Sequence, residues 1–127
     1  MLIGVPKEIK NHEYRIGLTP AGVKELTKNG HEVIVQKNGG AAIGLDDDQY
    51  IAAGAKMIET PEEIFDRAEM IIKVKEPQTN ECKMLKKGQV LYTYLHLAPD
   101  PEQTKLLVES GCTAIAYETV TDANGGL

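Results

Sequence analysis

The stretch of sequence that decides the fold reads Met70-Ile-Ile-Lys-Val-Lys-Glu-Pro77, then a short polar segment, then Gln89-Val-Leu-Tyr-Thr-Tyr-Leu-His96. Both apolar runs have the length and composition of strands that are buried on both faces of a sheet. Lys75 lies near the end of the first run, and His96 lies at the end of the second. Charged or titratable groups at the ends of buried strands need an explanation, and we interpret these two as working groups of an active site.

Strand-like and helix-like segments alternate along the whole chain. Strands are expected at residues 2–5, 31–36, 55–58, 69–75, 89–95 and 113–117. Helices are expected between them because most of the intervening segments open on a capping residue and close at a glycine; these are residues 20–29, 47–53, 61–67, 79–87 and 101–110. Alternation of this kind predicts a single α/β domain with a flavodoxin-like (Rossmann-like) parallel sheet and helices on both faces.

Composition narrows the class of protein. A chain of 127 residues is long enough for one domain with its own core. The net charge of −5 and the lack of a basic face argue against a nucleic-acid partner. No apolar run approaches the ~18 residues of a membrane span, and the first residues do not have the pattern of a secretory signal. Cys82 and Cys112 are interpreted as free thiols of a cytoplasmic protein, with a structural disulfide as the alternative.

Three side chains are expected to meet at one edge of the sheet. Arg15 follows the first strand, and Lys75 and His96 end two later strands. Ligands of an open parallel sheet bind outside the carboxyl ends of its strands, where all three residues are expected. Alternation along the strand also places Tyr92 and Tyr94 on the same face as His96.

This set of side chains suits a small anion that carries a carbonyl group. An Arg can hold a carboxylate through two hydrogen bonds, a Lys can polarise a carbonyl oxygen, and a His can move a proton near neutral pH. Each residue taken alone has a simpler explanation: a solvated Arg15, a Lys75 where solvent begins, a hydrogen-bonded structural His96. Glu118, at the end of the last strand, reaches the same edge, and a solvated carboxylate is its alternative interpretation.

Other motifs carry less information. The Gly-rich loop at residues 37–45 lacks the spacing of a dinucleotide fingerprint and follows the second strand instead of the first. The acidic run Asp46-Asp47-Asp48 is explained by a helix start. The histidines and cysteines lack any zinc spacing. Neither a metal site nor a cofactor site is therefore expected on this chain.

Several ordered motifs resemble the alanine dehydrogenase and transhydrogenase superfamily. The start, Ile3-Gly-Val-Pro-Lys-Glu8 with Arg15 and Leu18-Thr-Pro20, is similar to the start of both groups. The segments Lys73-Val-Lys-Glu-Pro77, Tyr92-Thr-Tyr-Leu-His-Leu97 and Thr113-Ala-Ile-Ala-Tyr-Glu-Thr119 resemble alanine dehydrogenase specifically. Together these matches span the whole chain.

The resemblance implies an NAD-dependent enzyme that interconverts L-alanine with pyruvate and ammonia. It also implies the role of each residue. Arg15 holds the substrate carboxylate, Lys75 binds the substrate and polarises its carbonyl or imine, and His96 is the general acid and base. Tyr94 and Glu118 are expected near the substrate pocket.

The resemblance further implies that residues 1–127 are the substrate domain of a longer, homo-oligomeric enzyme. The chain stops before a dinucleotide fingerprint, before the family's catalytic Asp and before a closing C-terminal segment, so we expect a fragment or truncated form that is inactive alone and binds no NAD. The loop Gly39-Gly-Ala-Ala-Ile-Gly-Leu45 departs from the family pattern. Two alternatives stay open: a transhydrogenase alpha-subunit domain, and a non-catalytic flavodoxin-like binding or signalling module. A reading frame that continues past Leu127 into a Gly-x-Gly-x-x-Gly segment would favour the enzyme.

Overall fold

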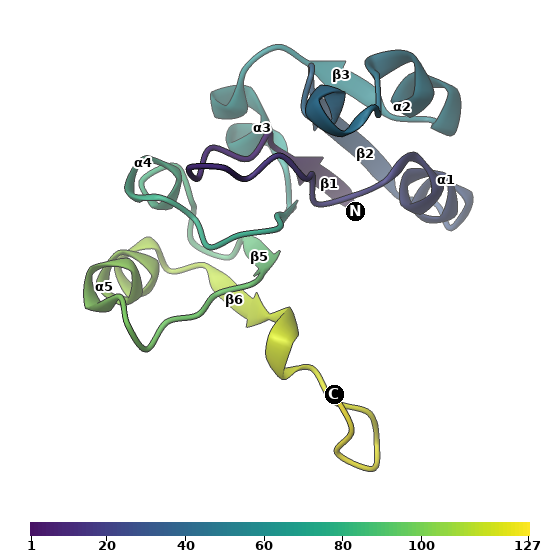
Figure 1. Cartoon of the computed structure of the whole chain (residues 1–127). Coiled ribbons are helices and arrows are strands. Elements are labelled where there is room, and N and C mark those ends of the chain that lie inside the picture. Colours follow the sequence, from purple (N-terminus) through teal and green to yellow (C-terminus); the bar gives the residue numbers. More distant parts are fainter.

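Six parallel strands form one sheet in the computed structural model, which describes residues 1–127 (Figure 1). The strands are β1 (Leu2–Val5), β2 (Glu32–Gln36), β3 (Lys56–Ile58), β4 (Met70–Ile72), β5 (Val90–Thr93) and β6 (Thr113–Ala116). Their order is β3-β2-β1-β4-β5-β6, the doubly wound order of Rossmann-type sheets, in which the winding reverses between β1 and β4. The predicted α/β class is confirmed.

Five helices connect the strands, and their starts are set by local capping. They are α1 (Pro20–Lys28), α2 (Asp47–Ala53), α3 (Pro61–Arg67), α4 (Thr79–Cys82) and α5 (Pro101–Ser110). The side chains of Thr19, Asp46, Thr60 and Asp100 each accept a hydrogen bond from a backbone N–H in the first turn of the helix that follows. Two short 3₁₀ turns, η1 (Ala41–Ile43) and η2 (Tyr117–Thr119), complete the structure. No helix is long and apolar enough to cross a bilayer.

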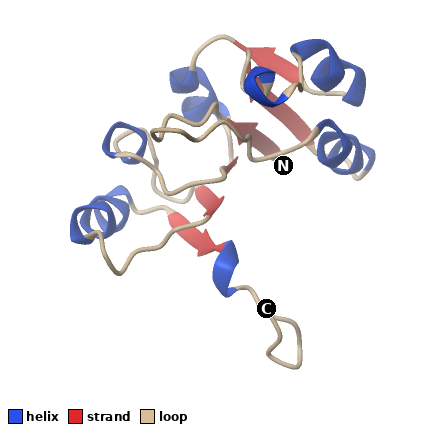
Figure 2. Ribbon diagram, in the orientation of Figure 1, coloured by secondary structure: helices blue, strands red, loops and turns tan.

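The helices cover the two faces of the sheet unequally (Figure 2). On one face, α1 and α2 bury Val23 and Tyr50 against the strands β1 and β2. On the other face, α3 contacts β1, β2 and β3, its Phe65 shares one buried cluster with Leu107 of α5, and α4 contacts α5. Figure 1 shows α1 and α2 beside the β1–β3 half of the sheet, with α3, α4 and α5 on the opposite side.

One half of one sheet face carries no helix. The strand register pairs Ile3 with Met70, and Tyr92 with both Ile72 and Ile115, so these residues point to the same face as α1 and α2. Met70, Ile72 and Tyr92 are only half-buried there, and Ile115 is 37% exposed. We call this surface of β4, β5 and β6 the open face.

The two strands that decide the fold are shorter than predicted. β4 ends at Ile72 and β5 ends at Thr93, so Lys75 and His96 lie in the loops that follow. The reason is that side chains replace the neighbouring strands as hydrogen-bond partners. The backbone N–H groups of Val74 and Lys75 donate to one carboxylate, as described below. The helix predicted from residue 79 to residue 87 is also shorter, and one α-helical turn is followed by i→i−3 turns.

Candidate active site

Lys75, Tyr94 and His96 form one stack at the carboxyl edge of the sheet. The Nζ atom of Lys75 lies 5.0 Å from the centre of the Tyr94 ring, within range of a cation–π interaction. The imidazole of His96 stacks on Tyr94 with 5.5 Å between ring centres and 14° between ring planes. The ring of Tyr94 therefore keeps an ammonium group and an imidazole close together. Lys75 and His96 meet here although each lies in a loop, beyond the end of its strand.

Glu118 contacts the backbone that carries His96. Its carboxylate accepts hydrogen bonds from the N–H groups of Leu95 and His96, each at 3.0 Å. Burial acts to raise the pKa of Glu118, but these backbone donors outweigh it, so the pKa lies below its ordinary value. His96 has a φ of 44°, which is uncommon for a residue with a side chain. The carboxylate thus holds the His96 loop in this conformation.

Arg15 is oriented by Glu13. Its Nε and Nη2 atoms donate to the two oxygens of the Glu13 carboxylate at 2.9 and 2.8 Å. The pKa of Glu13 is lowered to about 2, mainly by the hydrogen bond from Arg15, and the nearby charge of Lys75 contributes in the same direction. The Arg15 side chain is 62% exposed. Only the side edge of the guanidinium is used, so its Nη1–Nη2 end is free to bind a second carboxylate.

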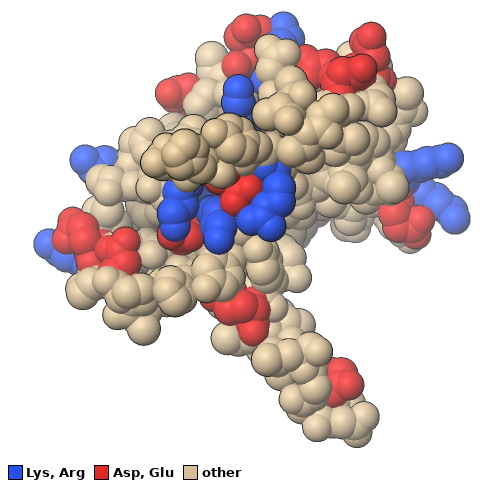
Figure 3. Space-filling view, viewed as in Figure 1, with Lys and Arg blue, Asp and Glu red and all other residues tan.

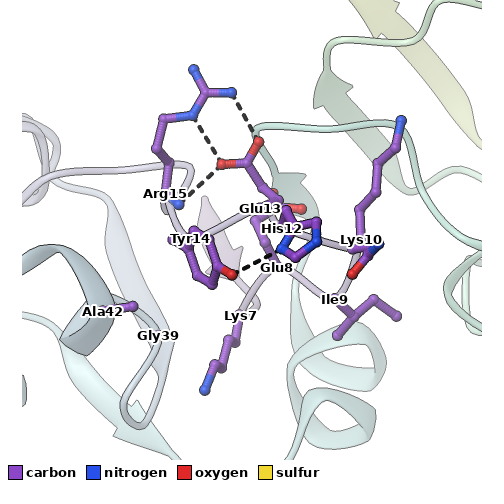
Figure 4. A pocket seen from close by; sticks show the side chains of 11 residues that line it. Lys7, Glu8, Ile9, Lys10, His12, Glu13, Tyr14, Arg15, Gly39 and Ala42 are labelled. Carbon is purple, nitrogen blue, oxygen red and sulfur yellow. Dashed lines mark hydrogen bonds and ion pairs between the residues drawn. The ribbon is translucent and has the colours of Figure 1, made fainter.

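A cavity of about 490 Å³ lies beside this Arg15–Glu13 pair (Figure 4). It is lined by the loop after β1 and by Gly39 and Ala42. Arg15 borders this cavity, whereas Lys75 and His96 do not. Tyr117 lies near this side of the surface: burial raises its pKa, the charge of Arg15 acts in the opposite direction, and its ring packs 6.3 Å from that of Tyr94.

Charges of both signs meet on this surface. Figure 3 shows Lys and Arg side chains around acidic ones near the middle of the face. Lys10 pairs with Glu76 across the gap between the loops after β1 and β4, in addition to the Arg15–Glu13 pair. No group of three or more His, Cys, Asp or Glu side chains is placed to hold a metal ion. Cys82 and Cys112 are unpaired.

Beneath the site lies a buried ion cluster that sequence reasoning missed. The Nζ atom of Lys73 lies 2.8 Å from Glu8 and 3.0 Å from Glu81, and all three side chains are at most 2% exposed. Burial raises the pKa of Glu81 more than Lys73 lowers it. The sequence pattern could have revealed this cluster. Residues 71 and 73 lie on the same face of a strand, so Lys73 points into the core like Ile71, and a buried ammonium needs an acidic partner.

The chain is similar throughout its length to one family. The family model described as "Alanine dehydrogenase/PNT, N-terminal domain" matches residues 4–127. The alanine dehydrogenase of Methanococcus maripaludis is 54% identical over 127 residues, which are all of this chain and 34% of that protein. The alanine dehydrogenase of Bacillus subtilis is 52% identical over 122 residues, 96% of this chain and 32% of that protein.

Solved structures show the same similarity. An L-alanine dehydrogenase structure superimposes with a TM-score of 0.94 at 46% identity, covering 99% of this chain and 35% of that one. A transhydrogenase from Sinorhizobium meliloti superimposes with a TM-score of 0.87 at 24% identity, covering 94% of this chain and 35% of that one, and it shows the shared fold alone. The chain spans about a third of the length of the proteins that it matches.

Proposed function

We propose a function from the premise that this chain belongs to the alanine dehydrogenase/PNT N-terminal domain family. It is the substrate-binding part of an NAD-dependent L-alanine dehydrogenase, an oxidoreductase of amino-acid metabolism that converts L-alanine, NAD and water into pyruvate, ammonia and NADH. The observation that carries this proposal is the stack of Lys75, Tyr94 and His96 at the sheet edge that also carries the loop of Arg15, whose side chain is exposed.

Arg15 and Lys75 hold the two ends of the substrate. The free end of the Arg15 guanidinium binds the carboxylate of pyruvate or alanine through two hydrogen bonds, while Glu13 keeps the opposite edge fixed. The Lys75 ammonium donates to the carbonyl oxygen of pyruvate, or to the imine nitrogen that replaces this oxygen, and draws electron density from the carbon that accepts hydride.

His96 moves a proton at the substrate oxygen. Imidazole titrates near neutral pH, so it can release a proton to a carbonyl oxygen and take one from a hydroxyl in the reverse direction. Tyr94 fixes the plane of the imidazole by stacking, and Glu118 fixes the backbone of the same loop. We therefore place Tyr94 and Glu118 at the border of the substrate site, where they orient His96.

The residues of this chain do not fit NAD. A dinucleotide in a doubly wound sheet binds where the winding reverses, with its pyrophosphate at a glycine-rich turn and a helix N-terminus. Here residues 6–19 separate β1 from α1 and contain a single glycine, Gly17, so this loop is not the glycine-rich turn that would receive a pyrophosphate. When NAD is bound it accepts the hydride from alanine, and we propose that it binds to a further part of a protein as long as the matched relatives.

The open face supports the same proposal. Half-buried apolar side chains such as Met70, Ile72 and Tyr92 are usually covered in a finished protein. We propose that residues 1–127 are the substrate domain, that a further segment of the longer protein covers this face, and that this protein is a homo-oligomer. Its unpaired Cys82 and Cys112 are in keeping with a cytoplasmic location.

Two measurements on the 127-residue chain test the proposal. In calorimetry, pyruvate should bind, and acetate, which keeps the carboxylate but lacks the carbonyl, should bind at least about tenfold more weakly because Lys75 has no partner. In an assay of NADH oxidation with pyruvate and ammonium, the chain alone should show no turnover, because hydride transfer needs a bound nicotinamide. Equal binding of both anions would contradict the substrate assignment, and robust turnover would contradict the division of roles.

A further inference from the structure

Side chains form hydrogen bonds with every backbone N–H and carbonyl group of the Val74–Lys75 dipeptide. The N–H groups of Val74 and Lys75 donate to Oε1 of Glu8 at 2.5 and 3.4 Å. The hydroxyl of Tyr117 donates to the carbonyl of Val74 at 2.8 Å. The hydroxyl of Thr93 donates to the carbonyl of Lys75 at 2.8 Å. We call Glu8, Thr93 and Tyr117 the Lys75 clamp.

The three residues of the clamp come from three different parts of the fold. Glu8 lies in the loop after β1, Thr93 is the last residue of β5, and Tyr117 begins η2 after β6. Glu8 and Thr93 are buried, with exposed fractions of 6% and 0% when the backbone atoms are counted together with the side chain. The dipeptide is thus fixed from both neighbouring strands and from the strand beyond, which a simple turn after β4 would not require.

The buried ion cluster in turn fixes Glu8. While Oε1 of Glu8 accepts from the backbone, its Oε2 accepts from the ammonium of Lys73 at 2.8 Å. Lys73 is held on its other side by Glu81, which also accepts from the N–H of Gln78. Both oxygens of the Glu8 carboxylate are therefore occupied, and the carboxylate cannot rotate away from the dipeptide without leaving a buried charge unpaired.

We propose that Glu8, Thr93 and Tyr117 are positioning residues, which direct the Lys75 ammonium at the substrate by fixing the backbone beneath it. A lysine side chain is long and flexible, so the place of its ammonium depends on where its backbone is held and on what its stem packs against. Displacement of such a group by about 1 Å is costly for binding and catalysis. The inference rests on the proposed function, because it takes pyruvate as the ligand of Lys75.

Thr93→Val is the sharpest variant, because it removes one hydroxyl at nearly constant shape. Thr93→Ser restores the hydroxyl and serves as the conservative rescue. Thr27→Val is the matched control, since the hydroxyl of Thr27 also donates to a backbone carbonyl, that of Ala53 at 3.2 Å, at the contact of α1 and α2. Tyr117→Phe is a second, partly exposed test in case the buried variant does not fold.

Two readouts are taken on the 127-residue chain: the dissociation constant for pyruvate, and the NMR order parameters of the Val74 and Lys75 amides. Thr93→Val and Tyr117→Phe should each weaken pyruvate binding by about tenfold, the effect of roughly one lost buried hydrogen bond. Order parameters at both amides should fall from the rigid value of about 0.85 towards 0.6. Thr93→Ser and Thr27→Val should match the wild type in both readouts.

The proposal is overturned if Thr93→Val leaves the order parameters of Val74 and Lys75 unchanged, or if Thr93→Ser loses as much as Thr93→Val. It is also overturned if Thr27→Val loosens the Val74–Lys75 dipeptide equally, because the effect would then follow from lower stability alone. If the wild-type chain binds no pyruvate, the proposed substrate is wrong, and the order parameters still decide whether the clamp holds Lys75.

Discussion

At the scale of single residues, the site depends on carboxylates that orient cations and loops. Glu13 fixes one edge of Arg15, Glu8 fixes the backbone of Lys75, and Glu118 fixes the backbone of His96. Each of the three groups proposed to touch the substrate is therefore supported by its own carboxylate. Such support reduces the conformational freedom that substrate binding would otherwise have to remove.

Arg15→Lys should weaken pyruvate binding to the 127-residue chain by about tenfold or more. A lysine has a single ammonium, which cannot bind Glu13 on one edge and a carboxylate on the other. Calorimetry measures the change, with Arg67→Lys as the matched control because Arg67 also pairs with a glutamate, Glu63 at 2.9 Å, on α3. An Arg15→Lys variant with the affinity of the wild type would refute the proposed role of the guanidinium.

The pair of Glu13 and Arg15 also predicts a pH dependence of stability. The pKa of Glu13 falls from 4.5 to about 2 on folding. A lowered folded-state pKa means that the stabilisation is fully present above pH 4.5 and is lost as the pH falls towards about 2. The difference in free energy of unfolding between the wild type and Glu13→Gln should therefore be constant above pH 4.5 and shrink below it. Urea denaturation over this range is the measurement, and a constant difference down to pH 2 would disagree with it.

At the scale of elements, helix starts could be predicted from the sequence, but the ends of the two central strands could not. Four side chains cap their helices with a bond to the residue three positions later, so the sequence pattern contains the whole interaction; these are Thr19, Asp46, Thr60 and Asp100. The end of β4 depends instead on Glu8, Thr93 and Tyr117, which are distant in sequence. Gly17 shows a similar long-range effect, because a Cβ there would lie 2.7 Å from the carbonyl oxygen of Ile72.

The same limit applies to the site. The residue types and the shared edge of Arg15, Lys75 and His96 followed from the order of strands and loops. The contacts of Glu118 and the existence of the buried cluster of Glu8, Lys73 and Glu81 depend on which strands become neighbours. The pairing of β1 with β4 is set by the winding of the sheet and is not visible in either segment alone.

Lys73→Met should lower the free energy of unfolding by about 3–5 kcal/mol, because it leaves two buried carboxylates without their cation. The matched control is Lys86→Met, which breaks an exposed pair with Asp66 and should cost less than about 1 kcal/mol. Urea denaturation of both variants measures the difference. A similar decrease in the free energy of unfolding for the two variants would mean that the buried cluster does not stabilise the loop between β4 and α4.

At the scale of the whole molecule, the main feature is the open face, where half of one side of the sheet carries no helix. α1 and α2 cover the β1–β3 half of one sheet face, while Ile72, Tyr92 and Ile115 on the same face carry no helix above them. Unequal covering of this kind fits a domain that packs against further protein.

Ile115→Thr should reduce self-association of the 127-residue chain without lowering its stability by more than about 0.5 kcal/mol, because the side chain is already partly exposed. Sedimentation velocity at increasing concentration measures the association. Val108→Thr on α5 is the matched control, since Val108 is 76% exposed but lies outside the open face. If the two substitutions changed self-association equally, the open face would no longer support the proposal that a further segment covers it.

The most direct test of the central claim is an NMR titration of the 127-residue chain with pyruvate, in which the signals of Arg15, Lys75 and His96 are followed together. We predict that the Arg15 Nε–H, the Lys75 side chain and the His96 imidazole shift along one common binding curve in the wild type, and that the Lys75 and His96 responses weaken together in Arg15→Lys. Shifts confined to other lysines, or three signals that saturate at different pyruvate concentrations, would contradict a single substrate site built from these residues.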